Sequence, residues 1–500
     1  MPTLPPSSIF VSHWSMPPRQ PISGLIRVKS GDEVVPVEGL LNRGTMLDAK
    51  HAARQWYVLV EPTTVHVPAQ RLTVEAVSGL ETETARFEVD LTPGTAAEVT
   101  IPITRFSDVA ADGWRAGNTH LHLMNMTRAE ADRYLQSIPR GDGLELVFLS
   151  YLRRFEAEER YTSNEYTRDD LDGLATPDLR FGNGEEHRHN FNTHGEGYGH
   201  VMLLNIQELI RPVSIGPGIM KTGTDGPPLA RGIRQAHRDG ASVVWCHNDY
   251  GLEDVPNWLA GTLDAQNIFD GSTSRDYRPT FYRYMNVGLR VPFSAGTDWF
   301  LYDFSRVYVQ LADPLTVEPL TVESWLKGLA AGRTFISNGP LFEFSLDGQA
   351  AGDVIDLPHA HSLPLRGRVV GRHDFEHLQV VHNGEVVAAV DSRPVAGHFE
   401  AAIETAIPFD QPGWLALRID SSNVNELGGQ LFGHTSAVYV DIAGRSTFHE
   451  ADALGLLDDM QQATETIIRE ARFADDAQQN EVLDVYQAGI KTLRQRLQNK

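Results

Sequence analysis

The sequence predicts an α/β protein with a central β/α region, a β-rich region on each side of it and a helical C-terminal segment. Three observations support this class. Strand-like runs alternate with helical spacing between residues 112 and 340. Short runs rich in branched residues, without helices between them, precede and follow that region. Apolar residues then recur at helical spacing to the C-terminus. We therefore expect four domains, with the boundaries 1–110, 111–340, 341–445 and 446–500.

Composition narrows the class of protein. The 500 residues are 41% hydrophobic and 22% charged, as in globular proteins. The formal net charge of −23 argues against binding to nucleic acid or to an anionic membrane, because both require a basic surface. The single cysteine, Cys246, excludes an intramolecular disulfide and a Cys-rich zinc site.

The sequence gives no sign of export or membrane insertion. The N-terminus has no basic segment followed by an apolar run, so we expect no signal peptide. No run approaches the roughly 18 apolar residues that a membrane span needs. We therefore expect a cytoplasmic protein without a membrane partner.

The N-terminal region is expected to be a small antiparallel β-sandwich. Residues 1–20 are rich in Pro and Ser and predict an irregular lead-in. Several runs then alternate apolar and polar residues between Gly, Pro or charged breaks. These predicted strands are 25–28, 55–60, 71–77, 85–91 and 98–103.

The central region is expected to be built from parallel strands that are buried on both faces, because its strands are almost continuously apolar. The predicted strands are 144–149, 200–206, 242–246, 265–269 and 291–295. Residues 228–239 predict a helix that Gly240 ends. The long polar stretch 150–200 is more typical of a functional loop than of a core element.

The C-terminal region is expected to be a second β-sandwich followed by a helical hairpin. Its predicted strands are 342–346, 378–381, 385–390, 413–419 and 437–442. Asn383-Gly384 predicts a hairpin turn between two of them. Thr447 and Glu450 have the spacing of a helix capping box. We expect the hairpin to pack on the rest of the protein or on a partner subunit, which would make a homo-oligomer.

His120 and His122 are the first candidate metal ligands. Two residues separated by one position in an extended segment face the same side, so both imidazoles can reach one ion. A two-residue motif arises often by chance, and two partly exposed histidines at a strand end are an equally good interpretation of this pair alone.

Further ligand types follow where other strands begin or end. Glu186 and His200 belong to a segment rich in His and Glu, while His247 and Asp298 each follow a predicted strand. In a β/α architecture such side chains gather at the C-terminal ends of the strands. Imidazole and carboxylate groups suit Zn²⁺, Mn²⁺ or Fe²⁺. Cys246 is expected to be inert packing that points away from the face used by His247.

These residues also resemble a known family. His120-x-His122, Gly184-x-Glu186, Gly199-His200, His247 and Asp298, in this order, resemble the PHP (polymerase and histidinol phosphatase) metallohydrolases. Four longer strings resemble the carbaryl-hydrolase-like (CehA/McbA) branch of that family. They are 281–298, 306–309, 331–340 and 433–440. The resemblance extends from about residue 20 to about residue 445 and leaves the helical tail outside.

The resemblance implies a PHP-like distorted (β/α)7 barrel and a centre of one or two divalent ions, with Zn²⁺ favoured and Mn²⁺ or Fe²⁺ as alternatives. Glu186 would bridge two ions. Ser150-Tyr151 stands where the wider family has an Asp-His pair, so we do not expect a third ion. The implied metal ligands are His120, His122, Glu186, His200, His247 and Asp298.

The leading hypothesis is a metal-dependent hydrolase that uses a metal-activated water to cleave a small ester, carbamate or amide. His200, His247 and Asp298 would act as catalytic groups that move the proton. Arg306 and Arg333 would hold an anionic group of the small-molecule substrate, unless their role is structural. The alternatives are a phosphoesterase of the PHP type and a non-catalytic metal- or carbohydrate-binding protein.

Overall fold

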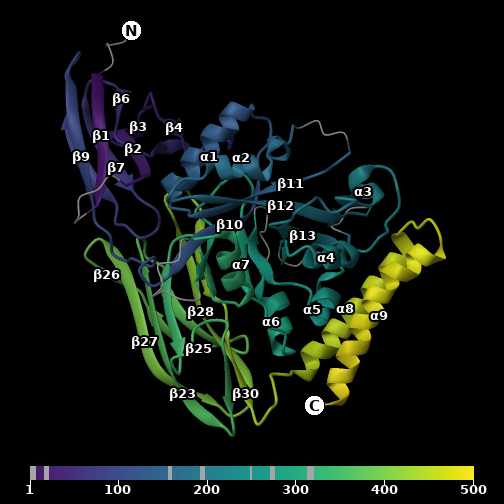
Figure 1. The fold of residues 1–500 in the computed structure, drawn as a ribbon. Helices are drawn as coiled ribbons and strands as arrows, with labels where there is room; N and C mark the ends of the chain where they lie inside the picture. Colours follow the sequence, from purple (N-terminus) through teal and green to yellow (C-terminus); the bar gives the residue numbers. More distant parts are fainter. Residues whose placement is uncertain are drawn as a thin grey trace.

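Figure 1 shows the protein as a computed structural model, which describes residues 7–15, 22–155, 160–191, 197–247, 251–270, 276–311 and 320–499. Helices and strands are mixed along the chain, which confirms the α/β class. The N-terminal strands (purple) and the C-terminal strands (green) lie beside the central region, and two long helices (yellow) cover one side of it. None of the described helices is long and apolar enough to cross a membrane.

The central region is a sheet in which β10 carries the His-x-His pair. In the order in which they pair, its strands from β10 onward are β10 (Trp114–His122), β11 (Leu146–Tyr151), β12 (Arg180–His189), β13 (Gly199–Leu204), β15 (Ser242–Trp245), β16 (Ala265–Asp270) and β17 (Phe293–Gly296), with β14 (Ser214–Ile215) beside β12. β10 also pairs with β18 (Asp298–Trp299) in parallel and with β19 (Arg306–Gln310) in the antiparallel sense. Among the described strands these pairings form a path rather than a closed ring, so the expected distorted (β/α)7 barrel is not confirmed.

The expectation of parallel strands is wrong for β13. The pairs β10–β11, β11–β12, β15–β16 and β16–β17 are parallel, but β13 runs antiparallel to both β12 and β15. Only residues 190–198 separate β12 from β13, which is shorter than the crossover that a parallel connection needs. The start of β13 therefore lies at the edge where its neighbours end, and His200 reaches the same edge from the opposite direction.

The expectation of a functional loop over 150–200 is wrong for residues 180–189, which form β12. This strand has buried residues along almost its whole length, although five of its last six residues are Glu, His or Arg. The same stretch also holds the short helices η2 (Thr162–Glu165) and α2 (Arg168–Leu174). The polar composition was misleading because these charged side chains are buried and pair with one another, Arg188 with Glu186 and His187 with Glu185.

Helices flank the central strands and fix their positions. They are α1 (Arg128–Asp142), α3 (Pro217–Met220), α4 (Leu229–Arg238), α5 (Asp254–Ala260), α6 (Arg278–Asn286) and α7 (Val322–Ala330). Trp325 of α7 packs directly on β10, where a Cβ at Gly117 would lie 2.4 Å from the indole ring. Gly117 therefore allows α7 to approach the strand that ends in His120 and His122.

The N-terminal region contains two sheets around one apolar cluster. One sheet holds β4 (Leu41–Asn42), β5 (Tyr57–Leu59), β2 (Gly24–Ser30), β7 (Arg71–Val77) and β8 (Ala85–Asp90), with β3 (Glu33–Val34) beside β2 and the 3-10 helix η1 (Ala52–Gln55) before β5. The other holds β6 (Thr63–Val67), β1 (Ser7–Ser15) and β9 (Ala96–Ile103). The expected irregular lead-in is thus wrong over residues 7–15, because this segment pairs with both β6 and β9.

The C-terminal strands continue the central sheet. β20 (Thr334–Ser337) pairs with β29 (Gln430–Thr435), and the sheet goes on through β22 (Val354–Leu357), β24 (His377–His382), β25 (Glu385–Asp391), β28 (Gly413–Val424) and β30 (Val438–Ile442). A separate sheet holds β21 (Leu341–Leu346), β23 (His361–Gly371), β27 (His398–Phe409) and β26 (Arg393–Val395). Asn383 and Gly384, at φ 53° and 94°, form the predicted turn between β24 and β25.

The tail is the predicted helical hairpin, made of α8 (Glu450–Glu470) and α9 (Asp476–Gln498). Its apolar face, which includes Val482, Tyr486 and Leu493, is buried within the protein's main apolar core. Contact with a partner subunit stays a prediction. The expected capping box is wrong, because α8 begins at Glu450 and Thr447 lies buried before the helix.

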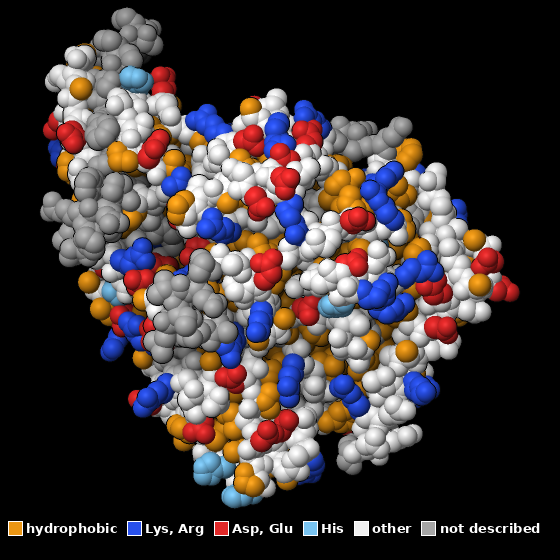
Figure 2. Space-filling view, viewed as in Figure 1, with side chains coloured by type: hydrophobic (Ala, Val, Ile, Leu, Met, Phe, Trp, Pro, Cys, Tyr) orange, Lys and Arg blue, Asp and Glu red, His pale blue; other side chains and the backbone are white. Residues whose placement is uncertain are grey.

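The visible surface is mixed in charge. Figure 2 shows Lys and Arg side chains interspersed with Asp and Glu on this face, with hydrophobic side chains between them. Large exposed apolar side chains include Leu454 and Ile468 on α8, which are 52% and 56% exposed.

Candidate metal centre

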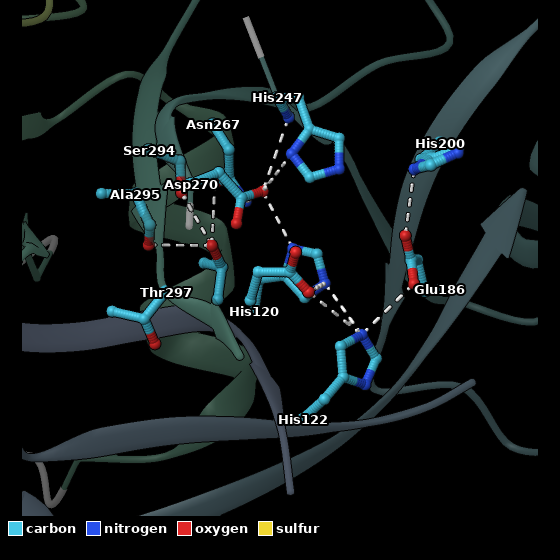
Figure 3. A network of polar contacts seen from close by, with 12 residues as sticks. His120, His122, Glu186, His200, His247, Asn267, Asp270, Ser294, Ala295 and Thr297 are labelled. Carbon is cyan, nitrogen blue, oxygen red and sulfur yellow. Dashed lines mark hydrogen bonds and ion pairs between the residues drawn. The ribbon is translucent and has the colours of Figure 1, made fainter. Parts of the chain in front are cut away.

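His120 and His122 lie at the end of β10 and are completely buried. As predicted, both imidazoles face the same side, with their Nε2 atoms 3.0 Å apart (Figure 3). The rings meet edge to face, with 4.9 Å between their centres. Two ring nitrogens this close must share a proton or a cation, because two lone pairs repel each other.

The other nitrogen of each ring shows which atom carries the hydrogen. Nδ1 of His122 lies 3.0 Å from the carbonyl oxygen of Ser150, which can only accept a hydrogen bond. Nδ1 of His120 lies 2.9 Å from Oδ2 of Asp270. Both Nδ1 atoms therefore donate, and in the neutral rings both Nε2 atoms face each other with lone pairs.

Two buried carboxylates complete this group. Oε2 of Glu186 lies 3.2 Å from Nε2 of His122, and Oδ1 of Asp298 lies 3.4 Å from Nε2 of His120 and 3.8 Å from Nε2 of His122. Ligands placed tetrahedrally around Zn²⁺ at normal bond lengths are roughly 3.3 Å apart. The donor atoms therefore have the chemistry and the spacing of a zinc-type site.

A second group of donors adjoins the first. Oε1 of Glu186 lies 3.1 Å from Nδ1 of His200, and the rings of His200 and His247 are 5.3 Å apart. Glu186, His200 and His247 offer ligand atoms that all lie within 4.8 Å of one another. One oxygen of Glu186 thus faces each group, which is the position of a bridging carboxylate. We call these six residues, His120, His122, Glu186, His200, His247 and Asp298, the His–carboxylate cluster.

Two members of this cluster have a strained backbone. His247 and Asp298 adopt φ values of 61° and 57°, in the left-handed region that residues other than Gly seldom occupy. Such strain persists only where the surroundings enforce it, and it is concentrated at functional sites. His247 lies just beyond β15, which ends at Trp245, and Asp298 begins β18 just beyond β17, which ends at Gly296, so the strain lies where each of these strands ends.

The electrostatics of the cluster keep the Glu186 carboxylate ionised. Burial opposes ionisation of Glu186, but Arg188, whose Nη1 donates to Oε2 at 3.0 Å, together with His122 and His200, lowers its pKa well below the usual value. Burial likewise opposes protonation of His120, yet Asp270 raises the pKa of this imidazole. The cluster therefore favours positive charge at its centre.

Asp270 was missed by sequence reasoning. It is the last residue of β16 and is 1% exposed. The predicted strand stopped at Phe269, although Asp270 follows that strand as directly as His247 follows its own. An Asp at a strand end usually indicates a turn, so the signal was present but not distinctive.

The expectation that Cys246 points away from the site is wrong. Cys246, His120 and Asp270 offer ligand atoms within 4.8 Å of one another, and burial raises the pKa of the thiol. The alternation of side chains along β15 does not continue through His247, because its positive φ turns the chain.

Other predicted residues lie outside the cluster. The guanidinium group of Arg306, 1% exposed, donates to the backbone carbonyls of Phe304 and Asp142, at 2.8 and 2.7 Å. Arg333 is half-buried and bonds through its backbone to residues 310 and 328. His189 pairs with Asp225 at 2.9 Å, and His194 lies outside the described residues.

Comparison of the chain with protein-family models, with curated proteins and with solved structures finds no match. The class of the protein therefore depends on its own geometry, which is that of an α/β protein with a buried cluster of imidazoles and carboxylates beside the central sheet.

Proposed function

We propose that the protein is a divalent-metal-dependent hydrolase that cleaves a small ester, carbamate or amide. One observation carries this proposal. The Nε2 atoms of His120 and His122 face each other at 3.0 Å, with both Nδ1 atoms used as donors and with the carboxylates of Glu186 and Asp298 close by. Four buried acceptors that converge in this way are stabilised by a cation.

The donor set fits one or two ions. His120, His122 and Asp298 would hold the first, and Glu186 would share a second with His200 and His247. Imidazole and carboxylate donors suit Zn²⁺, Mn²⁺ or Fe²⁺, and we propose Zn²⁺ first, with Mn²⁺ or Fe²⁺ as alternatives. When bound, such an ion supplies a Lewis acid that polarises a substrate carbonyl group and activates water.

The chain's own residues would bind the substrate and move the proton. The cluster is almost completely buried, which excludes bulk water and strengthens each charge interaction. His200, His247 or Asp298 would take the proton from the attacking water and pass it to the leaving group. Trp299, whose ring centre is 5.1 Å from that of His122, would contact the organic part of the substrate, and Arg154 lies 5.8 Å from the Trp299 ring.

The predicted substrate contacts of Arg306 and Arg333 are less well supported. The backbone carbonyls that Arg306 contacts favour a structural role, because they use its donors within the fold. A role for Arg333 in holding an anionic substrate group remains part of the proposal.

At the level of family, we propose a PHP-like metallohydrolase of the carbaryl-hydrolase-like branch, with a distorted (β/α)7 barrel between two β-sandwich domains. β10 has β11 on one edge and β18 on the other, and the backbone N–H of Thr297 donates to the carbonyl of His120 at that second edge. This arrangement supports a sheet that curves back toward its first strand. The two N-terminal sheets around one apolar cluster support a sandwich.

The test compares metal content and hydrolysis in purified protein. The assay uses an aryl acetate, an aryl carbamate, an aryl amide and an aryl phosphate, each with chelator and after metal is restored. We expect one or two equivalents of metal and metal-dependent hydrolysis of an ester, carbamate or amide. In a His120→Ala/His122→Ala variant both should be lost, activity by at least about 100-fold. His377→Ala, which changes a half-exposed histidine of β24, is the control.

The alternatives give different results. Cleavage of the phosphate alone would favour a phosphoesterase of the PHP type. Metal binding without hydrolysis of any substrate would favour a metal-binding protein without catalysis. A protein that binds no divalent metal would contradict the proposal.

A further inference from the structure

A buried carboxylate connects the two groups of donors. Oδ2 of Asp270 lies 2.9 Å from Nδ1 of His120 and 3.8 Å from Nδ1 of His247, and the backbone nitrogen of His247 is 3.5 Å from the same oxygen (Figure 3). His120 belongs to the group with His122 and Asp298, whereas His247 belongs to the group with Glu186 and His200. Asp270 itself is not among these six residues.

A chain of side-chain hydrogen bonds holds Asp270 in this orientation. Nδ2 of Asn267 donates to Oδ2 of Asp270 at 3.0 Å, and the hydroxyl group of Thr119 lies 2.8 Å from Oδ1 of Asn267. Thr119 precedes His120 in β10, while Asn267 precedes Asp270 in β16. The two strands are therefore joined by this network as well as through β17.

A close approach of the backbone makes the contact between Asp270 and His120 feasible. A Cβ at Gly296 would lie 2.4 Å from Cβ of His120 and 3.2 Å from Oδ1 of Asp270. Gly296 ends β17, which pairs with β16 and contacts β10, the strands that carry these two residues. A larger residue at this position would push the imidazole and the carboxylate apart.

The physical effect of such a carboxylate is known from general principles. An acceptor at Nδ1 fixes the hydrogen on that atom, so the lone pair of His120 stays on Nε2, which faces His122 and Asp298. The negative charge also makes the ring a stronger donor toward a cation. At His247 the same carboxylate attracts Nδ1 and holds the backbone at the point where φ is 61°.

We propose that Asp270 is a positioning residue shared by both groups of donors, and that it sets the metal affinity of both through His120 and His247. The proposal rests on the metal centre of the proposed function. It assigns to Asp270 no contact with the substrate. The network Thr119–Asn267–Asp270 acts with it, because it fixes the direction of the carboxylate.

The first experiment uses the metal-free protein. Nδ1–H of His120, bonded to a buried carboxylate, should give a solvent-protected, downfield proton resonance in ¹⁵N-histidine-labelled protein. We expect this resonance to be absent from Asp270→Leu and to be retained, shifted upfield, in Asp270→Asn, whose amide oxygen still accepts. A spectrum of Asp270→Leu that is unchanged would overturn the proposal whether or not the protein binds metal.

The second experiment titrates Zn²⁺ and Co²⁺ into wild type and variants. Asp270→Leu should weaken the binding of each metal equivalent by about 10- to 100-fold, and Asp270→Asn by less, which is rescue by the conservative variant. The visible spectrum of the Co²⁺ protein should change with Asp270→Leu. Asp264→Asn is the matched control, because Asp264 lies just before β16 and accepts from the backbone of Val243 at 2.7 Å.

The two proposals can fail separately. If wild type binds no metal, the proposed function fails, while the proton spectrum still tests the position of His120. If wild type binds metal and Asp270→Leu binds it equally well, the positioning role is wrong. Asp298→Asn is expected to weaken the binding of one metal equivalent, the one held by the first group. If Asp270→Leu likewise weakens the binding of only one equivalent, the shared role is wrong.

Discussion

Two buried polar clusters lie beside the central sheet, and they satisfy their charges in different ways. In the first, Arg43 is completely buried and donates twice to Asp142, at 2.8 and 2.6 Å, and to the carbonyl of Leu301. In the His–carboxylate cluster, the closest atoms are acceptors that face one another, as His120 and His122 do at 3.0 Å. The first cluster holds its cation as the Arg43 side chain. In the second, Arg188 pairs with Glu186, and we propose that a metal ion joins the remaining ligand atoms.

The two clusters are equally buried, but we assign a structural role to the first and a functional role to the second. The Arg43 pair joins the N-terminal region to α1 and to the segment after β18, so its charges belong to the fold. The cluster around Glu186 gathers two carboxylates and four imidazole rings beside the central sheet. Burial of polar groups is costly unless they are paired, and a metal ion of the kind we propose would pair the ligand atoms that converge in the second cluster.

The largest effect on the free energy of unfolding is expected when Arg43, the cation of the first cluster, is removed. Arg43→Met leaves Asp142 buried without its partner and should lower the free energy of unfolding by about 3–5 kcal/mol. Denaturant unfolding measures this loss. The double variant Arg43→Met/Asp142→Leu should recover much of it, while metal content at low temperature stays that of wild type. If Arg43→Met is as stable as wild type, the first cluster is not held together by its own cation and the contrast between the two clusters is wrong.

The next largest effect on the free energy of unfolding is expected when a chelator removes the proposed metal ion from the second cluster. Metal at 100 times its Kd stabilises a folded protein by about 2.7 kcal/mol, so a chelator should lower the free energy of unfolding by a similar amount. Thermal unfolding with and without chelator measures it. The His120→Ala/His122→Ala variant should show no dependence on chelator. Equal unfolding of wild type in both conditions would contradict a bound ion.

His434 sharpens the comparison, because it is a buried histidine whose two nitrogens both have protein partners. Nδ1 donates to the carbonyl of Thr435 at 2.6 Å and Nε2 accepts from the hydroxyl group of Tyr282 at 2.8 Å. Burial, the largest cause, lowers the pKa of His434 to about 3. The neutral ring is therefore part of the folded state.

The pH dependence follows from that shift. The folded pKa lies below the unfolded value, so the contribution of His434 is fully present above about pH 6.5 and is lost as pH falls toward 3. The loss is about 1.4 kcal/mol per pH unit in this window. Denaturant unfolding at pH 7, 6 and 5 should show a shallower slope in His434→Gln than in wild type. Equal slopes would contradict a neutral, fully bonded imidazole.

The sequence predicted the elements of the cluster better than their arrangement. His120 and His122 were found because strand geometry places alternate residues on one face, and His247 and Asp298 because they follow apolar strands. β12 was missed, since its buried charged residues have the composition of a surface segment. The antiparallel direction of β13 depends on the length of one connection, which the sequence pattern did not reveal. The role of Asp270 depends on its contact with His120, which only the three-dimensional structure shows.

The smallest effect on the free energy of unfolding is expected for an exposed pair of charged groups. His377 and Asp391 form a pair at 2.9 Å on β24 and β25, with side chains 50% and 86% exposed. Water screens such a pair and each side chain loses freedom to form it, so His377→Ala should change the free energy of unfolding by less than about 1 kcal/mol. Metal content and hydrolysis should stay at the wild-type level, since His377 belongs to neither buried cluster. His120 and Asp270 in the buried cluster are also 2.9 Å apart, so a loss of metal in His377→Ala would mean that burial and convergence do not define the site.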